Sequence, residues 1–225
     1  MKALAIDSAA ANMIIAAKNE NMTATVSLDL GQKQSQKILP AIDYVLKEAG
    51  IEAKELDYTA LCSGPGTFTG LRLAFSALKA IELAHNVPIY GVPSLEAYAF
   101  PFRNFPNQIV SVIDAKKDQF FAAVYRGDET LMEAEDTTAE KVLSKIIKDE
   151  AVIVAGPDAK IFGEILKNLE PNLKICWTES EPLSTDSLFK IAEKMIEQKK
   201  EPLADYSGPV YIRKSEAELA LESKK

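Results

Sequence analysis

The chain has 225 residues, of which 47% are hydrophobic, and carries a formal net charge of −7. This length suits one large or two small domains, with ample apolar material for a core. So acidic a chain is poorly suited to hold nucleic acid by itself, because neutralising phosphates requires clustered lysines and arginines. It can still serve a nucleic-acid pathway through a partner.

Two further features bear on where the chain works. Cys62 and Cys176 lie far apart in the sequence, which favours a reduced, cytoplasmic setting over a disulfide framework. The N-terminal segment Met-Lys-Ala-Leu-Ala-Ile-Asp has too few consecutive apolar residues for a signal peptide or a membrane span. We therefore expect a cytoplasmic protein that does not enter a membrane.

The first half of the chain predicts the element order β-β-β-α-β-α-β-α. Apolar runs bounded by turn residues indicate the strands, and apolar residues at helical spacing indicate the helices. Gly50 follows the first helix as a C-cap glycine. The predicted strands are 4–6, 13–17, 23–28, 58–62 and 88–92, and the predicted helices are 35–49, 69–84 and 94–100.

The second half repeats this layout after a boundary at 101–108. Ile113-Asp114, followed by an apolar strand at 120–124, resembles Ile6-Asp7, followed by the strand at 13–17. Further strands are predicted at 151–155 and 173–177, and helices at 138–148, 159–169 and 187–198. We expect an α/β chain of the actin-like (ASKHA) fold, with duplicated βββαβαβα lobes at 1–103 and 104–213 and a charged, frayed or disordered tail at 214–225.

Asp7 and Asp114 would then occupy equivalent positions, each at the end of its lobe's first strand. In the actin-like fold the turn after that strand faces the cleft between the lobes, so both side chains are expected there. The alternative is that both aspartates only end a strand and begin a turn. The residues by themselves leave both interpretations open.

The segment 63–70, Ser-Gly-Pro-Gly-Thr-Phe-Thr-Gly, joins a predicted strand to a predicted helix. Gly64 and Gly66 can adopt positive φ and admit a close approach by backbone or ligand. Thr67 or Thr69 can cap the helix, and a glycine-rich loop at a helix N-terminus readily binds anions. This loop is therefore a candidate part of the cleft.

The phosphate-binding turns of a working actin-like kinase are missing. Such a kinase needs glycine after the first acidic residue, so that backbone amides can surround phosphates, but here the turn is Asp-Ser-Ala-Ala-Ala-Asn. The turn at 114–118 also lacks glycine, and Pro157 removes an amide donor from the turn at 155–158. We expect a degenerate cleft that binds nucleotide weakly and holds no cofactor. Its predicted residues are Asp7, Ser8, Gly64, Pro65, Gly66, Thr67, Thr69 and Asp114.

The chain has a single histidine, His85, at the end of the helix predicted at 69–84. A polar or charged group suits a helix C-terminus, so we interpret His85 as a residue that caps the helix or interacts with its dipole. One histidine cannot supply a paired-histidine metal site, and the Gly-x-Ser-x-Gly motif of many serine hydrolases is absent. We therefore predict neither catalytic residues nor metal ligands.

Two neighbouring helices carry more apolar surface than one core needs. In the helix at 69–84, one face suits the chain's own sheet, and a second face forms a stripe of small residues that a partner helix could approach closely. The alternative is that the preceding helix of this chain covers the stripe. We favour an interface, which in isolation can pair with itself as a homodimer. The predicted interface residues are Leu39, Tyr44, Arg72, Leu73, Ala77, Ala80 and Ala84.

Several segments resemble the bacterial TsaB (YeaZ) family. The central one, Ser-Gly-Pro-Gly-Thr-Phe-Thr-Gly-Leu-Arg-Leu at 63–73, closely resembles the family signature Gly-Pro-Gly-Ser-Phe-Thr-Gly-Leu-Arg. Gln34 departs from the pattern, since family members often carry histidine there. Supporting matches lie at 4–8, 35–43, 92–96, 113–116, 124–125 and 209–213.

The resemblance implies an actin-like, two-lobed protein needed to make threonylcarbamoyladenosine in tRNAs that read codons beginning with A. It implies a non-catalytic paralogue of the enzyme TsaD that binds TsaD through its N-terminal lobe, with the ATPase TsaE joining the pair. The transferase site and its metal then belong to TsaD. The residues leave two alternative functions. A small-molecule phosphotransferase would need the missing glycine turns, and a metallopeptidase would need more metal ligands than the single histidine offers.

Overall fold

The computed structural model describes residues 1–20, 22–29, 33–178 and 184–213, so the predicted tail at 214–225 lies outside the described residues. One five-stranded sheet consists of β1 (Lys2–Asp7), β2 (Asn12–Asn19), β3 (Met22–Asp29), β4 (Tyr58–Gly64) and β5 (Ile89–Pro93). The other consists of β6 (Gln108–Asp114), β7 (Phe120–Arg126), β8 (Glu129–Thr137), β9 (Val152–Ala155) and β10 (Ile175–Trp177). The helices are α1 (Gln34–Glu48), α2 (Phe68–His85), α3 (Ser94–Ala99), α4 (Ala139–Lys145), α5 (Ala159–Leu169) and α6 (Ser184–Glu197), with short 3₁₀ turns η2 (Ala53–Glu55) and η3 (Phe100–Phe102).

The two sheets have the same topology. The strand order is β3-β2-β1-β4-β5 in one and β8-β7-β6-β9-β10 in the other. In each, the central strand pairs antiparallel with the strand that follows it and parallel with the fourth strand. The predicted duplication of an α/β unit is therefore confirmed. Asp7 and Asp114 each end the central strand of a sheet, as the sequence predicts.

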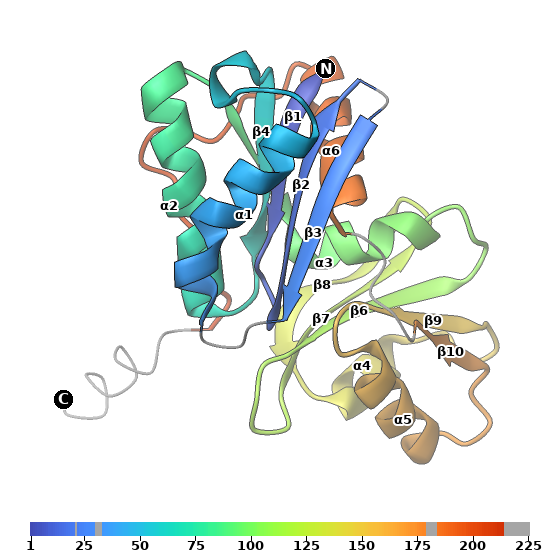
Figure 1. Cartoon of the computed structure of the whole chain (residues 1–225). Coiled ribbons are helices and arrows are strands. Elements are labelled where there is room, and N and C mark those ends of the chain that lie inside the picture. Colours follow the sequence, from blue (N-terminus) through green and yellow to red (C-terminus); the bar gives the residue numbers. More distant parts are fainter. Residues whose placement is uncertain (21, 30–32, 179–183, 214–225) are drawn as a thin grey trace.

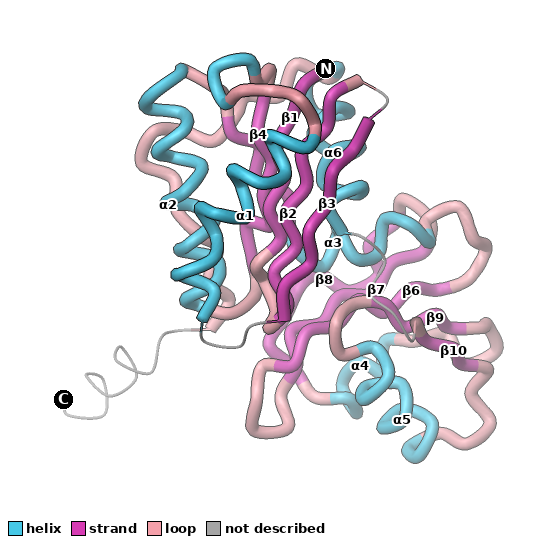
Figure 2. The backbone as a smooth tube through the Cα atoms, viewed as in Figure 1, coloured by secondary structure: helices cyan, strands magenta, loops and turns pink. Residues whose placement is uncertain are grey.

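The elements form five layers. Helices α1 and α2 cover one face of the first sheet, α3 and α6 lie between the sheets, and α4 and α5 cover the outer face of the second (Figures 1 and 2). Side chains alternate along β1 accordingly: Ala3 and Ala5 belong to the core between the sheets, whereas Leu4 and Ile6 pack beneath α1 and α2. Burial on both faces explains why this strand is a continuous apolar run.

Helix α6 packs on the first sheet, although the strand before it in the chain belongs to the second. It follows β10 of the second sheet but contacts β1, β2, β4 and β5 of the first. The carboxylate of Glu193 on α6 accepts hydrogen bonds from Lys18 Nζ at 2.6 Å and from the Tyr58 hydroxyl at 3.0 Å. The division into lobes at 1–103 and 104–213 stays a prediction. By sequence α6 belongs to the second range, but it covers the sheet of the first.

Two observed elements, β8 and α4, differ clearly from the sequence prediction. Strand β8 has no counterpart in the ranges predicted from the sequence, because Glu129–Thr137 carries four acidic residues and no clear apolar run. Such charge is typical of an edge strand, and β8 is the edge of its sheet. Helix α4 ends at Lys145, short of the predicted 148, because Ile146 already has extended backbone.

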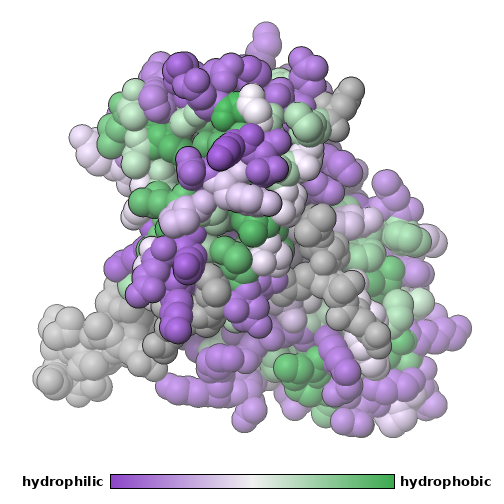
Figure 3. All heavy atoms as spheres, in the orientation of Figure 1, coloured by the Kyte–Doolittle hydropathy of each residue, from purple (hydrophilic) through white to green (hydrophobic). Residues whose placement is uncertain are grey.

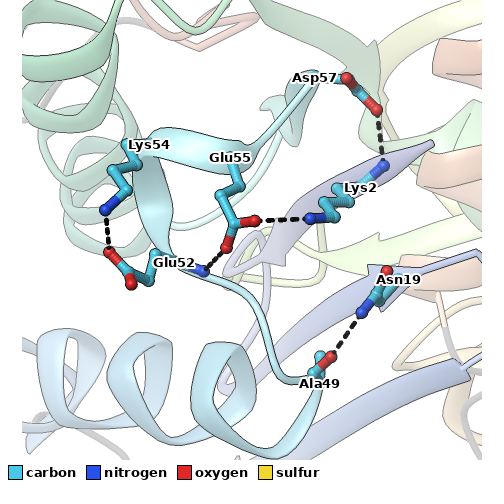
Figure 4. A network of polar contacts seen from close by, with 7 residues as sticks. All are labelled: Lys2, Asn19, Ala49, Glu52, Lys54, Glu55 and Asp57. Atoms are coloured by element: carbon cyan, nitrogen blue, oxygen red, sulfur yellow. Dashed lines mark hydrogen bonds and ion pairs between the residues drawn. The ribbon is translucent and has the colours of Figure 1, made fainter.

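The connection between α1 and β4 is tied back onto the first sheet (Figure 4). The ammonium of Lys2 on β1 contacts Glu55 Oε1 at 2.7 Å, and the Lys2 amide donates to Asp57 Oδ2 at 2.7 Å. Asn19 Nδ2 on β2 donates to the carbonyl of Ala49, just after α1, at 2.9 Å. These contacts hold the end of α1 beside the first sheet.

Candidate functional site

A pocket of about 350 Å³ lies between the lobes, at the point where the central strands end. The turn after β1, the start of α2, the end of β6 and the turn before α5 all contribute to it, as expected for the cleft. Thr67 and Asp114 are the predicted cleft residues that line it. The lining residues are Ala10, Ala11, Asn12, Asp29, Thr67, Ile113, Asp114, Lys116, Pro157 and Asp158.

The sequence predicts Asp7 in the cleft, but Asp7 does not line this pocket, because hydrogen-bond donors of the chain itself surround its carboxylate. The side chain is buried, with 3% exposure. Its oxygens accept hydrogen bonds from the Ala9 amide at 3.0 Å, the Tyr98 hydroxyl at 3.2 Å and the Ser184 hydroxyl. These donors come from the following turn, from α3 and from the start of α6. Asp7 is therefore a structural centre that joins three parts of the fold.

Cys62 lies in the same buried region. Burial raises the pKa of its thiol well above the usual value, and the charge of Asp7 raises it further. The thiolate is the reactive form of cysteine, so Cys62 is unsuited to nucleophilic chemistry.

Asp114, in contrast, is half-exposed at the pocket. Its carboxylate accepts hydrogen bonds from the Lys116 amide at 2.7 Å and from Lys116 Nζ at 2.5 Å. Partial burial acts to raise the pKa of Asp114, but the hydrogen bonds from Lys116 outweigh it and lower that pKa. The Asp114 amide donates to Asp158 Oδ2 at 2.7 Å, yet burial still raises the pKa of Asp158.

The charges around the pocket are unfavourable for phosphate. Among the described residues that line it, three are acidic, Asp29, Asp114 and Asp158, and one, Lys116, is basic. Lys116 is already paired with Asp114 at 2.5 Å. An entering nucleotide would place its phosphates against uncompensated carboxylates in a site of reduced dielectric. In the part of the chain that the structure describes, the lining therefore does not provide the cationic surface of a phosphate site.

The glycine-rich loop packs against the chain's own β1–β2 turn. A Cβ atom at Gly66 would lie 2.4 Å from the Ala9 carbonyl oxygen, and one at Gly70 would lie 2.0 Å from that of Ser8. The Thr67 amide donates to Ala9 O at 2.7 Å, so one amide of the candidate anion cradle is already used. Positions 66 and 70 therefore require glycine, because a side chain there would prevent the close approach of the two backbone segments.

Other predictions for this loop are met in part. Gly64 has a positive φ of +118°, whereas Gly66 is not among the positive-φ glycines. Thr67 is the N-cap residue of α2 but makes no capping hydrogen bond, because its hydroxyl donates to Ser8 O at 3.3 Å. Pro65 is buried and Thr69 is exposed. Gln34, the departure from the family pattern, donates to Ala11 O at 2.8 Å and so also holds the β1–β2 turn.

His85 ends α2 and is exposed, with left-handed Asn86 as the C-cap. Among the described residues, no group of three or more histidine, cysteine or acidic side chains is placed to hold a metal ion. Within the same ranges, no helix is long and apolar enough to cross a membrane.

The predicted interface stripe divides between core and surface. Ala77 is buried with 7% exposure in the core shared by α1 and α2, and Leu73 is half-buried against that core. The preceding helix therefore covers this part of the stripe, and Ala77 cannot meet a partner. Ala80 and Ala84 are exposed. Ala41 on α1 is also buried.

An apolar surface nevertheless remains on these two helices. Leu39 and Tyr44 on α1 are 64% and 53% exposed, and Leu83 on α2 is 85% exposed. The prediction missed Leu83, although Arg72, Ser76, Ala80 and Leu83 follow one helical face. Figure 3 shows hydrophobic residues gathered over α2 beside hydrophilic ones. We call Leu39, Tyr44, Ala80, Leu83 and Ala84 the α1–α2 surface.

Comparison with known proteins identifies the family. Residues 29–221 match the family model described as TsaD, tRNA N6-adenosine threonylcarbamoyltransferase. The chain is also 30% identical to the tRNA threonylcarbamoyladenosine biosynthesis protein TsaB of Buchnera aphidicola over 149 residues, which are 65% of this chain and 71% of that protein. The chain belongs to the TsaB (YeaZ) family. It is 26% identical to the Bacillus subtilis protein of the same description, over the full length of both.

Solved structures agree on the fold. YeaZ from Pseudomonas aeruginosa matches with a TM-score of 0.75 at 21% identity, covering 93% of this chain and 99% of that one. A Bacteroides thetaiotaomicron protein with an actin-like ATPase fold matches with a TM-score of 0.50 at 9% identity, covering 84% of this chain and 95% of that one. The predicted actin-like fold is thus confirmed.

Proposed function

We propose that this chain is a non-catalytic partner subunit in the formation of threonylcarbamoyladenosine in tRNA. In this proposal it binds and supports a TsaD-like catalytic paralogue, together with a TsaE-like ATPase, in the cytoplasm. Membership of the TsaB family supports the pathway, since relatives of this chain are described as threonylcarbamoyladenosine biosynthesis proteins. The net charge of −7 fits a protein that reaches tRNA through partners.

One observation carries the non-catalytic part of the proposal. The carboxylate of Asp7, at the end of the central strand, is buried and fully engaged by three internal donors. Next to it, the backbone of Ser8 and Ala9 is packed against Gly70 and Gly66. An actin-like kinase needs an accessible acid and free amides at this turn, whereas here the acid is buried and the Ala9 amide donates to it.

The α1–α2 surface supports the partner role. Its large side chains are Leu39, Tyr44 and Leu83, each more than half exposed, and Ala80 lies on the same face of α2 as Leu83. Large exposed apolar side chains on neighbouring helices favour a protein interface. We propose that a TsaD-like protein covers this surface in the complex and that a second copy covers it in isolation, as an isologous homodimer.

Co-purification tests the proposal in the cell that makes the chain. The tagged chain is recovered from native lysate, and its bound proteins are identified by mass spectrometry. We expect a TsaD-like protein in stoichiometric amounts with the unaltered chain and its loss with Ala80→Glu. Recovery of enzymes of small-molecule metabolism in place of a TsaD-like protein would favour the phosphotransferase alternative.

A further inference from the structure

The segment 203–213, which we call the C-terminal strap, runs along the first lobe after α6. The Leu203 amide donates to Ile89 O on β5 at 2.8 Å, and the Val210 amide donates to Ser63 O on β4 at 2.7 Å. Gly64 makes the second contact possible, because a Cβ atom there would lie 2.3 Å from the Val210 carbonyl oxygen. Two backbone hydrogen bonds thus fix the strap to the first sheet.

Tyr211 adds a side-chain anchor at the start of α2. Its hydroxyl accepts a hydrogen bond from Arg72 Nε at 3.0 Å, and its ring centroid lies 4.9 Å from that of Phe68. The Arg72 guanidinium lies 3.7 Å from the Phe68 ring centroid. Aromatic and cation–π contacts of this kind hold the strap against the first turn of the helix.

Two residues further on, Arg213 reaches the second lobe. Its Nε and Nη2 donate to the two oxygens of Asp136 on β8, at 2.5 and 2.7 Å. Its Nη1 donates to the carbonyl of Ala115, after β6, at 2.6 Å. A planar guanidinium that makes a bidentate pair and a third bond defines both distance and orientation.

A core of buried side chains, to which α3 and α6 contribute, joins the two sheets, and Ile212 of the strap packs against it. A hollow of about 520 Å³ lies beside this core, lined by Leu95 and Glu96 of α3, by Val210 and Ile212 of the strap and by Tyr125 of the second lobe, among others. The second lobe is thus held on one side of the hollow by the core that includes α3 and α6, and on the other by Arg213. Domains joined at one packed contact can rotate about it unless a second contact holds them.

We propose that the C-terminal strap is a clamp that holds the two lobes at a fixed angle, with Arg213 as the locking residue. When Arg213 is removed, the second lobe gains freedom to rotate about the core between the sheets. The strap then remains on the first lobe through Leu203, Val210 and Tyr211.

Pulsed electron paramagnetic resonance between one spin label on each lobe tests the clamp. Cys176 on β10 is exposed and accepts one label, whereas Cys62 is buried, and Thr23→Cys on β3 provides the second site. The labelled full chain is diluted with unlabelled chain, so that only distances within one molecule are measured. The clamped chain is expected to give one narrow distance distribution.

Arg213→Ala is expected to add a second, longer distance, and Asp136→Ala to do the same from the opposite side of the pair. The matched control is Arg126→Ala, which removes an arginine of the second lobe whose partner, Glu150, belongs to the same lobe. This control should keep the single narrow distribution. A single narrow distribution in Arg213→Ala, or in Asp136→Ala if the former does not fold, would overturn the clamp.

Discussion

The Ser8 hydroxyl donates a 2.7 Å hydrogen bond to the Gly70 carbonyl, and a Cβ atom at Gly70 would lie 2.0 Å from the Ser8 carbonyl oxygen. These contacts fix the β1–β2 turn on the first turn of α2. They occupy the junction of turn and helix, where an actin-like kinase would present free amides to phosphate. The glycine-rich loop is therefore explained by packing within the chain.

Gly70→Ala should destabilise the fold by about 1–3 kcal/mol, because the new methyl group meets backbone that cannot move aside. Urea unfolding followed by circular dichroism measures the change. Gly208→Ala is the matched control, since a Cβ atom there has no neighbour within 4 Å. It should change the free energy of unfolding by less than about 0.5 kcal/mol. Equal stability of the two variants would contradict the close approach.

Asp158→Asn should stabilise the chain at neutral pH. Burial raises the pKa of the Asp158 carboxyl, so the folded state binds its proton more tightly than the unfolded state does. The original chain thus loses stability as pH rises from the unfolded pKa through the folded pKa, and the amide removes that loss. Thermal melting across this range should show the variant's advantage growing with pH. An advantage that does not change with pH would contradict this assignment.

Ala77→Arg should reduce the stability of the fold, whereas Ala80→Glu should weaken association and leave stability unchanged. Ala77 is buried between α1 and α2, so arginine there should cost about 3–5 kcal/mol of stability as an unpaired buried charge. Ala80 is exposed on the α1–α2 surface, so glutamate there should leave the melting temperature unchanged and weaken association by about 2 kcal/mol.

Melting curves combined with size-exclusion chromatography, with and without the TsaD-like partner, separate the two variants. If Ala80→Glu melts normally and still associates, the interface lies elsewhere on the molecule.

The sequence predicted the repeated architecture well because its signals are local. Ile6-Asp7 and Ile113-Asp114 end equivalent strands, and the apolar runs on either side mark buried β-structure. The burial of Asp7 could not be predicted, because its hydroxyl donors, Tyr98 and Ser184, are 91 and 177 residues away. Whether Ala77 was core or surface likewise depended on how closely α1 packs on α2, which spacing along a single helix does not determine.

The isolated chain should bind ATP only weakly. Asp29, Asp114 and Asp158 line the pocket between the lobes, and Lys116, the one lysine among its described lining residues, is already paired with Asp114. Isothermal titration calorimetry on the purified chain should therefore give no affinity in the low micromolar range. A low-micromolar dissociation constant would mean that the pocket rearranges to accept phosphates.

The central claim, that the chain supports tRNA modification without performing it, is tested most directly by reconstitution. The chain is incubated with ATP, threonine, bicarbonate and tRNA, alone and with its companion proteins, TsaD-like and TsaE-like proteins among them. Nucleoside mass spectrometry then measures threonylcarbamoyladenosine. We predict product in the complete mixture, none with the chain alone, and a loss when the chain is omitted or replaced by Ala80→Glu. Modified nucleoside formed by the chain alone, or undiminished product in its absence, would contradict the account.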